Sequence, residues 1–309
     1  MNYEDFLLNL IKNDERFVVI TAENRAAIRN LPNIVKDRFI DVGIAEQTMV
    51  GLAAGLALRG RIPIVHALAT FLTMRAFEFI RTDVGIGNLP VKLVGAVPGF
   101  LSDGNGPTHQ AIEDISLMRG IPPMNIFCPA DEEDMLIGLK EVLLSPSPFY
   151  IRFNNLKPAV EHKKDFRIGK AELISEGRDI VILTYGILLR QAVEAAAILR
   201  TEGKSVGIIN LRTLKPIDEE AIRDSCSRKV LLVTLEDHFV TGGLYSIISE
   251  FLVREKLSCN VLPIALMNKW FKPALLPDVL TYEEFTSEDI AGRINKELIR
   301  LSERKEYSF

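Results

Sequence analysis

The chain has 309 residues, 48% of them hydrophobic and 25% charged, a composition typical of a globular protein that buries a sizeable core. Its formal net charge is −4 and its Lys and Arg residues form no cluster, which argues against a nucleic acid or an anionic membrane surface as the partner. The three cysteines are far apart in sequence, and no apolar run reaches the roughly 18 residues of a membrane span. We therefore expect a protein of a reducing compartment, the cytoplasm.

Apolar runs alternate with helical patterns through the first half of the chain. The predicted strands cover 17–21, 61–68, 91–97 and 124–130, and the predicted helices cover 45–60, 73–85 and 131–144. The strands are apolar along almost their whole length, as strands covered on both faces are. Strands that alternate with helices indicate βαβ units and a mainly parallel sheet.

The alternation stops over residues 145–172, which are rich in proline, asparagine and charged residues. We place a domain boundary near 156–170, which gives domains of about 1–160 and 170–309. A second alternating block follows it. Its predicted strands cover 179–186, 204–211 and 229–237, and its predicted helices cover 187–203 and 241–255. The expected fold class is therefore α/β, with two domains, the second smaller than the first.

Three segments carry side chains suited to a site. In the segment 39–60, Asp41 ends an apolar run, Gly43 makes a turn and Glu46 begins a helix. Glu46 is either a helix N-terminal residue favoured by the helix dipole, or a carboxylate in an apolar niche that hydrogen-bonds a ligand nitrogen. The sequence pattern leaves both interpretations open.

The second segment, 99–115, is rich in glycine and ends in His109 and Gln110, which we expect to open a helix. A glycine-rich loop at the carboxyl end of a parallel strand is where α/β sheets bind ligands, although His109 could also pack locally. The third segment, 69–81, holds Phe71, Met74 and Phe77, an aromatic cluster that is usually part of a core. We find no metal-binding motif, because the four histidines are isolated in the sequence.

Taken in order, the motifs of the chain resemble those of the C-terminal portion of transketolases. The matching stretches are VGIAEQ, TFLTMRAFEFIR, GNGPTHQAIEDISLMRGIPPMNIFCPADEED, INLRTLKPIDEEAI and TLEDHFVTGGLYS. The resemblance implies a pyrimidine-binding domain over 1–160, with a parallel sheet and helices on both faces, and a transketolase C-terminal domain over 170–309. The implied cofactor is thiamine diphosphate, and the implied reaction transfers a two-carbon ketol unit from a ketose to an aldose.

The resemblance also assigns roles to residues around the cofactor. Glu46 matches the catalytic glutamate that hydrogen-bonds N1′ of the aminopyrimidine ring. Phe71 matches the aromatic residue that stacks on this ring, and Ile44 is expected on the other side of it. Met74 and Phe77 are expected as further neighbours in the pocket.

On the substrate side, the resemblance implies that His109 hydrogen-bonds the sugar and moves protons, and that Arg152 holds an anionic group of the substrate. Two positions depart from common transketolases. Val97 stands where a histidine is usual, and Asn105 stands where an aspartate reads a hydroxyl of the acceptor sugar. These departures favour a modified sugar, such as a deoxy, branched or sulfonated one, over the usual sugar phosphates.

The chain contains no GDG sequence, the motif with which transketolases bind Mg²⁺ and the diphosphate. The resemblance therefore implies a split enzyme, in which a separate subunit carries that motif together with the metal. Pyrimidine domains of this family pair across a two-fold axis, so we expect homodimerisation of this chain and an α2β2 assembly.

Three alternatives remain open from the sequence. The chain could be the β subunit of a 2-oxo-acid dehydrogenase, or a fragment of a 1-deoxyxylulose-5-phosphate synthase, since both share the fold and the glutamate. It could also be a non-catalytic binding protein that keeps the pyrimidine domain, although Glu46, Phe71 and His109 are all retained.

Overall fold

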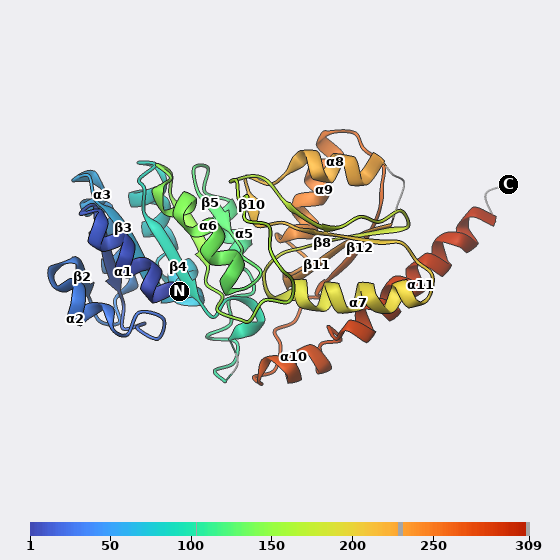
Figure 1. Cartoon of the computed structure of the whole chain (residues 1–309), viewed down its shortest axis with the longest axis horizontal. Coiled ribbons are helices and arrows are strands. Elements are labelled where there is room, and N and C mark those ends of the chain that lie inside the picture. Colours follow the sequence, from blue (N-terminus) through green and yellow to red (C-terminus); the bar gives the residue numbers. More distant parts are fainter. Residues whose placement is uncertain (103, 228–230, 307–309) are drawn as a thin grey trace.

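The computed structural model describes residues 1–102, 104–227 and 231–306, which form two β-sheets side by side (Figure 1). The first sheet has the strand order β10-β5-β6-β4-β3-β1-β2. Its strands are parallel except for β10, which pairs antiparallel with β5. The strands are β1 (Phe17–Thr21), β2 (Phe39–Asp41), β3 (Ile62–Leu68), β4 (Lys92–Ala96), β5 (Asn125–Phe127), β6 (Phe149–Arg152) and β10 (Thr213–Lys215).

Helices cover both faces of the first sheet because its strands are apolar on both sides. In β1, Phe17 and Val19 belong to one buried cluster, whereas Val18 and Ile20 belong to another. The first cluster lies under α1 (Tyr3–Asn13), α2 (Leu31–Val35) and α6 (Glu132–Leu144). The second lies under α3 (Glu46–Leu58), the helical segment 71–85 and α5 (Asp114–Arg119).

The second sheet has the order β12-β11-β8-β9-β7 and is parallel except for β7. Figure 1 shows α8 and α9 on one face of this sheet and α7 and α11 on the other. The strands are β7 (Glu172–Ser175), β8 (Ile180–Thr184), β9 (Val206–Asn210), β11 (Leu231–Phe239) and β12 (Asn260–Leu266). The helices are α7 (Leu189–Thr201), α8 (Glu219–Ser227), α9 (Leu244–Arg254), α10 (Leu276–Tyr282) and α11 (Ser287–Glu306).

The expected α/β fold with two sheets is confirmed, and the predicted strands and most predicted helices appear within a few residues of their expected bounds. Residues 229 and 230 of the strand predicted over 229–237 lie outside the described residues. The helix predicted over 73–85 is instead two π-helical turns, Phe71–Arg75 and Ile80–Gly85, around the short α4 (Phe77–Phe79). The helix expected to open at His109 and Gln110 begins at Asp114, because residues 104–110 form successive turns.

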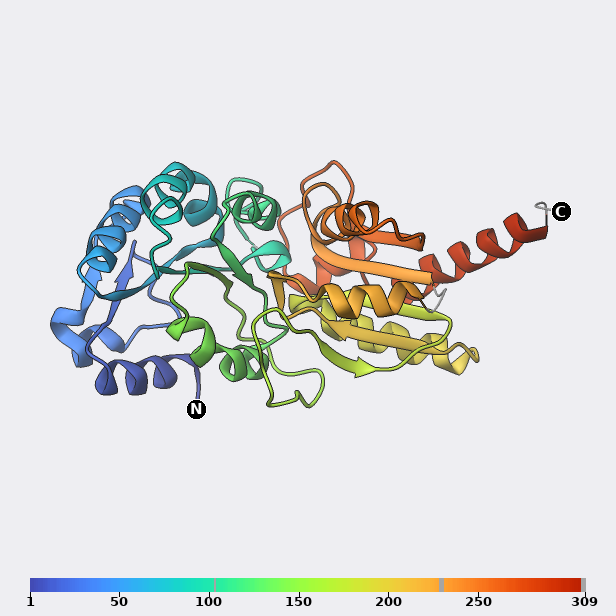
Figure 2. The ribbon, with the colours of Figure 1, turned by 90° about the horizontal axis from the view of Figure 1, so that it is seen from above.

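The two halves are closely joined, as the view from above shows (Figure 2). One buried cluster runs from α3 and β3 into β8, α8 and α9, so the halves share apolar core as well as a linker. Strand β10, which follows β9 in the chain, crosses back to complete the edge of the first sheet. Among the described residues, no helix has the length and apolar character needed to cross a membrane.

Candidate functional site

The candidate site is a cavity at the carboxyl ends of β1, β2 and β3. Because these neighbouring strands are parallel, the segments that follow Thr21, Asp41 and Leu68 meet at one edge of the sheet. The cavity has a volume of about 340 Å³. Its lining comprises Ala22, Glu23, Asn24, Arg25, Ala26, Ile44, Glu46, Leu68 and Phe71.

Glu46 is the buried acid of this cavity. It is the first residue of α3, and only 2% of its surface is exposed. Its Oε2 accepts a hydrogen bond from Nη1 of Arg75 at 2.8 Å, whereas Oε1 has no hydrogen bond to any residue that the structure describes. The turn before it is fixed by Asp41, whose carboxylate accepts a hydrogen bond from the backbone N–H of Gly43, a glycine at φ 71°. Glu46 therefore has one oxygen available to a ligand.

The aromatic ring of Phe71 contacts two polar side chains. The guanidinium carbon of Arg75 stands 4.1 Å from its centroid, and the ring of His109 meets it edge-on with the centroids 4.9 Å apart. His109 is half-buried, and its Nδ1 forms a 2.9 Å hydrogen bond with the hydroxyl of Thr108. The structure thus brings Glu46, Phe71 and His109 into one connected group.

Four other residues singled out from the sequence lie outside this group. Met74 and Phe77 do not line the cavity: the sulfur of Met74 accepts a 3.6 Å hydrogen bond from the hydroxyl of Thr70, and Phe77 packs against the buried cluster. Asn105 is exposed on the glycine-rich loop. Val97 adopts φ 49° just after β4, a left-handed conformation that is rare for a β-branched residue and one often found near functional sites.

Arg152 is placed differently from its predicted role. Only 4% of its side chain is exposed, its Nε donates to Asp114 at 2.9 Å, and its Nη1 donates to Asp237 at 2.7 Å. Asp237 belongs to the second sheet, so Arg152 ties the two halves together. Gly99 (φ 58°) lets the backbone pass this pair, since a Cβ there would stand 1.8 Å from Asp237 Oδ2. This burial argues against contact between Arg152 and a substrate anion.

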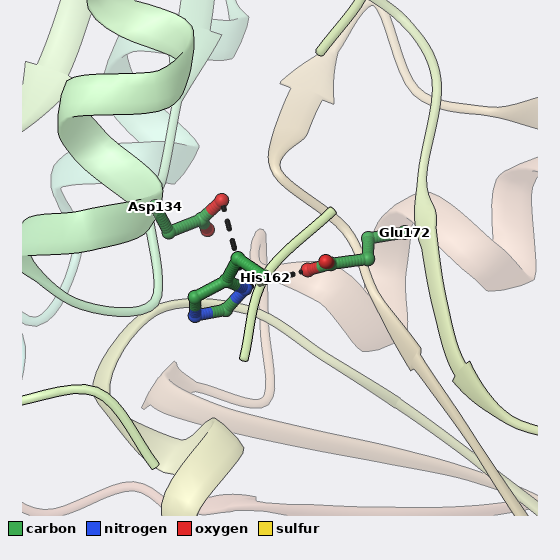
Figure 3. A group of neighbouring side chains, drawn as sticks. All are labelled: Asp134, His162 and Glu172. Atoms are coloured by element: carbon green, nitrogen blue, oxygen red, sulfur yellow. Dashed lines mark hydrogen bonds and ion pairs between the residues drawn. The ribbon is translucent and has the colours of Figure 1, made fainter. Parts of the chain in front are cut away.

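A second buried group, the junction network, consists of Asp131, Asp134, His162, Glu172 and Arg212. Asp134 comes from α6, His162 from the linker and Glu172 from β7 (Figure 3). The ring nitrogens of His162 bond Glu172 and Asp131, each at 2.8 Å. Arg212 pairs with Asp134 at 2.6 Å and with Glu172 at 2.9 Å.

The atoms of Asp134, His162 and Glu172 lie close enough together to ligate a metal ion. The guanidinium of Arg212, however, already supplies a cation to both carboxylates. Burial alone would lower the pKa of His162, but its hydrogen bonds to Asp131 and Glu172 and the charge of Asp134 outweigh burial and raise the pKa to about 10. With Arg212 and the protonated His162 as its cations, the junction network is best described as a set of buried ion pairs that fastens the linker to both halves.

Our predictions from sequence missed Arg75 and the loop 22–26. Arg75 was visible as a cation four residues after Phe71, a spacing that brings two side chains to the same side of a helix. The loop 22–26 follows the first predicted strand, and only the strand order shows that this strand lies between β2 and β3.

Two family descriptions match the chain. Residues 2–158 match "Transketolase, pyrimidine binding domain" and residues 169–290 match "Transketolase, C-terminal domain". Among curated relatives, a 6-deoxy-6-sulfo-D-fructose transketolase subunit from Clostridium sp. (strain MSTE9) is 38% identical over 255 residues, which cover 81% of this chain and 79% of that subunit. A 1-deoxy-D-xylulose-5-phosphate synthase from Dictyoglomus thermophilum is 41% identical over 240 residues, covering 76% of this chain but only 38% of that enzyme.

Solved structures give the same result. A structure described as "Split gene transketolase, inactive beta4 tetramer" has a TM-score of 0.85 and 32% identity, covering 95% of this chain and 96% of that one. A transketolase from Pichia stipitis has a TM-score of 0.77 at 18% identity, covering 96% of this chain and 45% of that one, a likeness of fold alone.

Proposed function

Since the chain belongs to the transketolase family, we propose that it is the subunit of a split, thiamine-diphosphate-dependent transketolase that binds the aminopyrimidine end of the cofactor. Residues 1–160 form the pyrimidine-binding domain in this proposal, and residues 170–309 form the second domain. The enzyme transfers a two-carbon ketol unit from a ketose to an aldose.

One observation carries the proposal: a buried glutamate lines a cavity and has one carboxylate oxygen that no residue described by the structure hydrogen-bonds. In the cavity this oxygen is open to a ligand, and a ring nitrogen that carries or shares a proton would hydrogen-bond it. Phe71 offers a flat apolar surface to a planar ring, and Ile44, 71% exposed, supplies apolar contact in the same cavity. These residues fit an aminopyrimidine.

When bound, thiamine diphosphate supplies the carbanion chemistry that breaks and forms the carbon–carbon bond. Glu46 holds the proton at the ring nitrogen, and Phe71 sets the plane of the ring. His109 is half-buried and contacts the ring of Phe71 edge-on without lining the cavity itself, and in this proposal it holds or moves a proton on the hydroxyl groups of the sugar. Asn105, on the same loop, is proposed to contact the sugar as well.

A partner subunit is proposed to hold the diphosphate and Mg²⁺ through a GDG motif. Support comes from the relative described as an inactive β4 tetramer, a name that fits a β chain lacking its partner. Exposed apolar residues on and beside α3, namely Leu58 (72%) and Ile86 (76%), favour pairing of this chain with a second copy in an α2β2 assembly.

The donor sugar is proposed to be a modified ketose. The sulfofructose enzyme among the relatives acts, by its name, on a sugar with a sulfonate, and Val97 and Asn105 depart from the pattern of enzymes that use sugar phosphates. The likeness to 1-deoxy-D-xylulose-5-phosphate synthase supports a second candidate, the joining of pyruvate to an aldehyde.

The test is to co-purify the chain with a candidate GDG-bearing partner and to measure binding of thiamine diphosphate with Mg²⁺, with and without that partner. Ketol transfer is then assayed with 6-deoxy-6-sulfofructose, xylulose 5-phosphate and fructose 6-phosphate as donors, and with pyruvate as the alternative. We expect tight binding only in the complex, and transfer that falls by at least about 100-fold in Glu46→Gln.

Glu78→Gln is the matched control, because Glu78 is exposed on the neighbouring helical segment and loses the same charge. It should leave transfer unchanged. The proposal would be refuted if the complex that carries Glu46→Gln bound the cofactor and transferred the ketol unit as well as the wild-type complex. If pyruvate were the one donor used and the ketoses were not, the result would favour the synthase reaction.

A further inference from the structure

Arg75 does not line the cavity, but it contacts two residues that do. Its Nη1 donates to Glu46 Oε2 at 2.8 Å, and its guanidinium stacks on Phe71 at 4.1 Å from the ring centroid. Arg75 thus touches both the carboxylate and the aromatic ring to which the aminopyrimidine is proposed to bind, and it does so from outside the cavity.

The contact with Glu46 has a clear physical effect. The Glu46 side chain is 3% exposed, and a buried carboxylate needs a charged or hydrogen-bonding partner. Because Arg75 bonds only Oε2, the carboxylate can no longer rotate freely, and Oε1 is left for a ligand. A charge-assisted hydrogen bond is strong enough to fix this orientation before a ligand arrives.

The contact with Phe71 restricts the aromatic ring in the same way. A guanidinium over an aromatic face gains a favourable cation–π contact, which opposes rotation of the ring. Phe71 and Arg75 begin and end one π-helical turn, a widened turn that often occurs at functional sites. One side chain therefore sets the carboxylate and the ring relative to each other.

We propose that Arg75 is a positioning residue for the aminopyrimidine, which holds Glu46 and Phe71 in the geometry that the bound ring requires. This inference rests on the proposed function, since it concerns the same cavity. Without the guanidinium, Glu46 and Phe71 remain present, but the carboxylate rotates and the hydrogen bond to the ring nitrogen loses its alignment.

The test compares Arg75→Gln, Arg75→Lys and Glu46→Gln in the assembled two-chain complex. Two quantities are measured: the Kd of thiamine diphosphate with Mg²⁺, and the rate at which the acidic C2 proton of the bound cofactor exchanges with D₂O. Exchange needs no sugar, so it does not depend on the substrate. We expect exchange to fall about 10- to 100-fold in Arg75→Gln, with a smaller rise in Kd, and partial rescue in Arg75→Lys.

Arg81→Gln is the matched control, because Arg81 is exposed on the same segment and has no side-chain hydrogen bond or ion pair within the described ranges. It should leave both quantities unchanged. If Glu46→Gln slows exchange but Arg75→Gln does not, the positioning role is wrong while the proposed function stands. If neither variant slows exchange, the proposed function itself fails.

A third result would also overturn the inference. If Arg75→Gln tightens cofactor binding and speeds exchange, the guanidinium competes with the ring for Glu46 instead of positioning it. The double variant Glu46→Gln/Arg75→Gln separates these cases further. The part of the effect that Arg75 exerts through Glu46 disappears once Glu46 is changed, so Arg75→Gln should slow exchange less in the double variant than it does alone.

Discussion

Two of the arginines that pair with carboxylates in this molecule differ sharply in burial: Arg212 in the junction between the halves and Arg75 at the rim of the cavity. In the junction, the side chain of Arg212 is 2% exposed and pairs with two buried carboxylates. At the rim, the side chain of Arg75 is 41% exposed and pairs with one. We therefore expect that loss of the junction guanidinium destabilises the fold strongly, whereas loss of the rim guanidinium leaves the protein folded.

The largest expected effect comes from Arg212→Met, which removes the guanidinium that pairs with the buried carboxylates of Asp134 and Glu172 and leaves His162 as the cation beside them. We expect a loss of about 3–5 kcal/mol in the free energy of unfolding, measured by urea denaturation at fixed protein concentration. Arg254→Met is the control, because the Arg254–Glu219 pair is exposed to water and should contribute little to stability. Equal losses in both variants would show that the junction network is not a special source of stability.

Gly99→Ala tests the other link across the junction, the Arg152–Asp237 pair. A Cβ at this position would collide with Asp237 Oδ2, and the backbone is left-handed, so we expect destabilisation by about 2–4 kcal/mol. Gly292→Ala in α11 meets nothing within 4 Å and should instead stabilise by about 0.5–1 kcal/mol. A neutral Gly99→Ala would mean that the two halves can separate at this contact at little cost.

The junction network also makes stability depend on pH. The pKa of His162 is raised from 6.5 to about 10 in the folded chain, so its contribution is complete below pH 6.5 and is lost as pH rises through about 10. As the pH rises through this window, deprotonation linked to His162 lowers the free energy of unfolding by at most about 1.4 kcal/mol per pH unit. When the free energy of unfolding is measured by urea denaturation at several pH values from 6 to 10, it should fall less steeply with pH in His162→Gln than in the wild type. Equal slopes in the two proteins would contradict the charged state of His162.

The smallest expected effect on stability belongs to Arg75→Gln. Because this side chain is half in water, its loss should change the free energy of unfolding by about 1 kcal/mol or less, measured by the same urea denaturation. A loss as large as that of Arg212→Met would remove the contrast between junction and rim. It would also mean that changes in cofactor exchange in this variant reflect unfolding.

Local patterns in the sequence were enough to predict much of the fold. The short, nearly continuous apolar runs that became β1, β3, β8 and β9 predicted strands with two apolar faces, which need helices to cover them on each side. The periodic stretches that became α6 and α9 are helices for equally local reasons. The π-helical turns at 71–85 and the late start of α5 were missed, because both depend on packing and turns that periodicity does not encode.

For the site, the sequence by itself determined which side chains are present: an acid at a helix start, an aromatic cluster and a histidine after a glycine-rich loop. Only the tertiary structure decided which of them meet, because contact depends on the order of the strands in the sheet. That order brings Glu46, Phe71 and His109 together and adds Arg75, while it buries Arg152 at the junction between the two halves. The sequence gives the identity of each side chain, but burial and charge pairing depend on contacts between segments that are far apart along the chain.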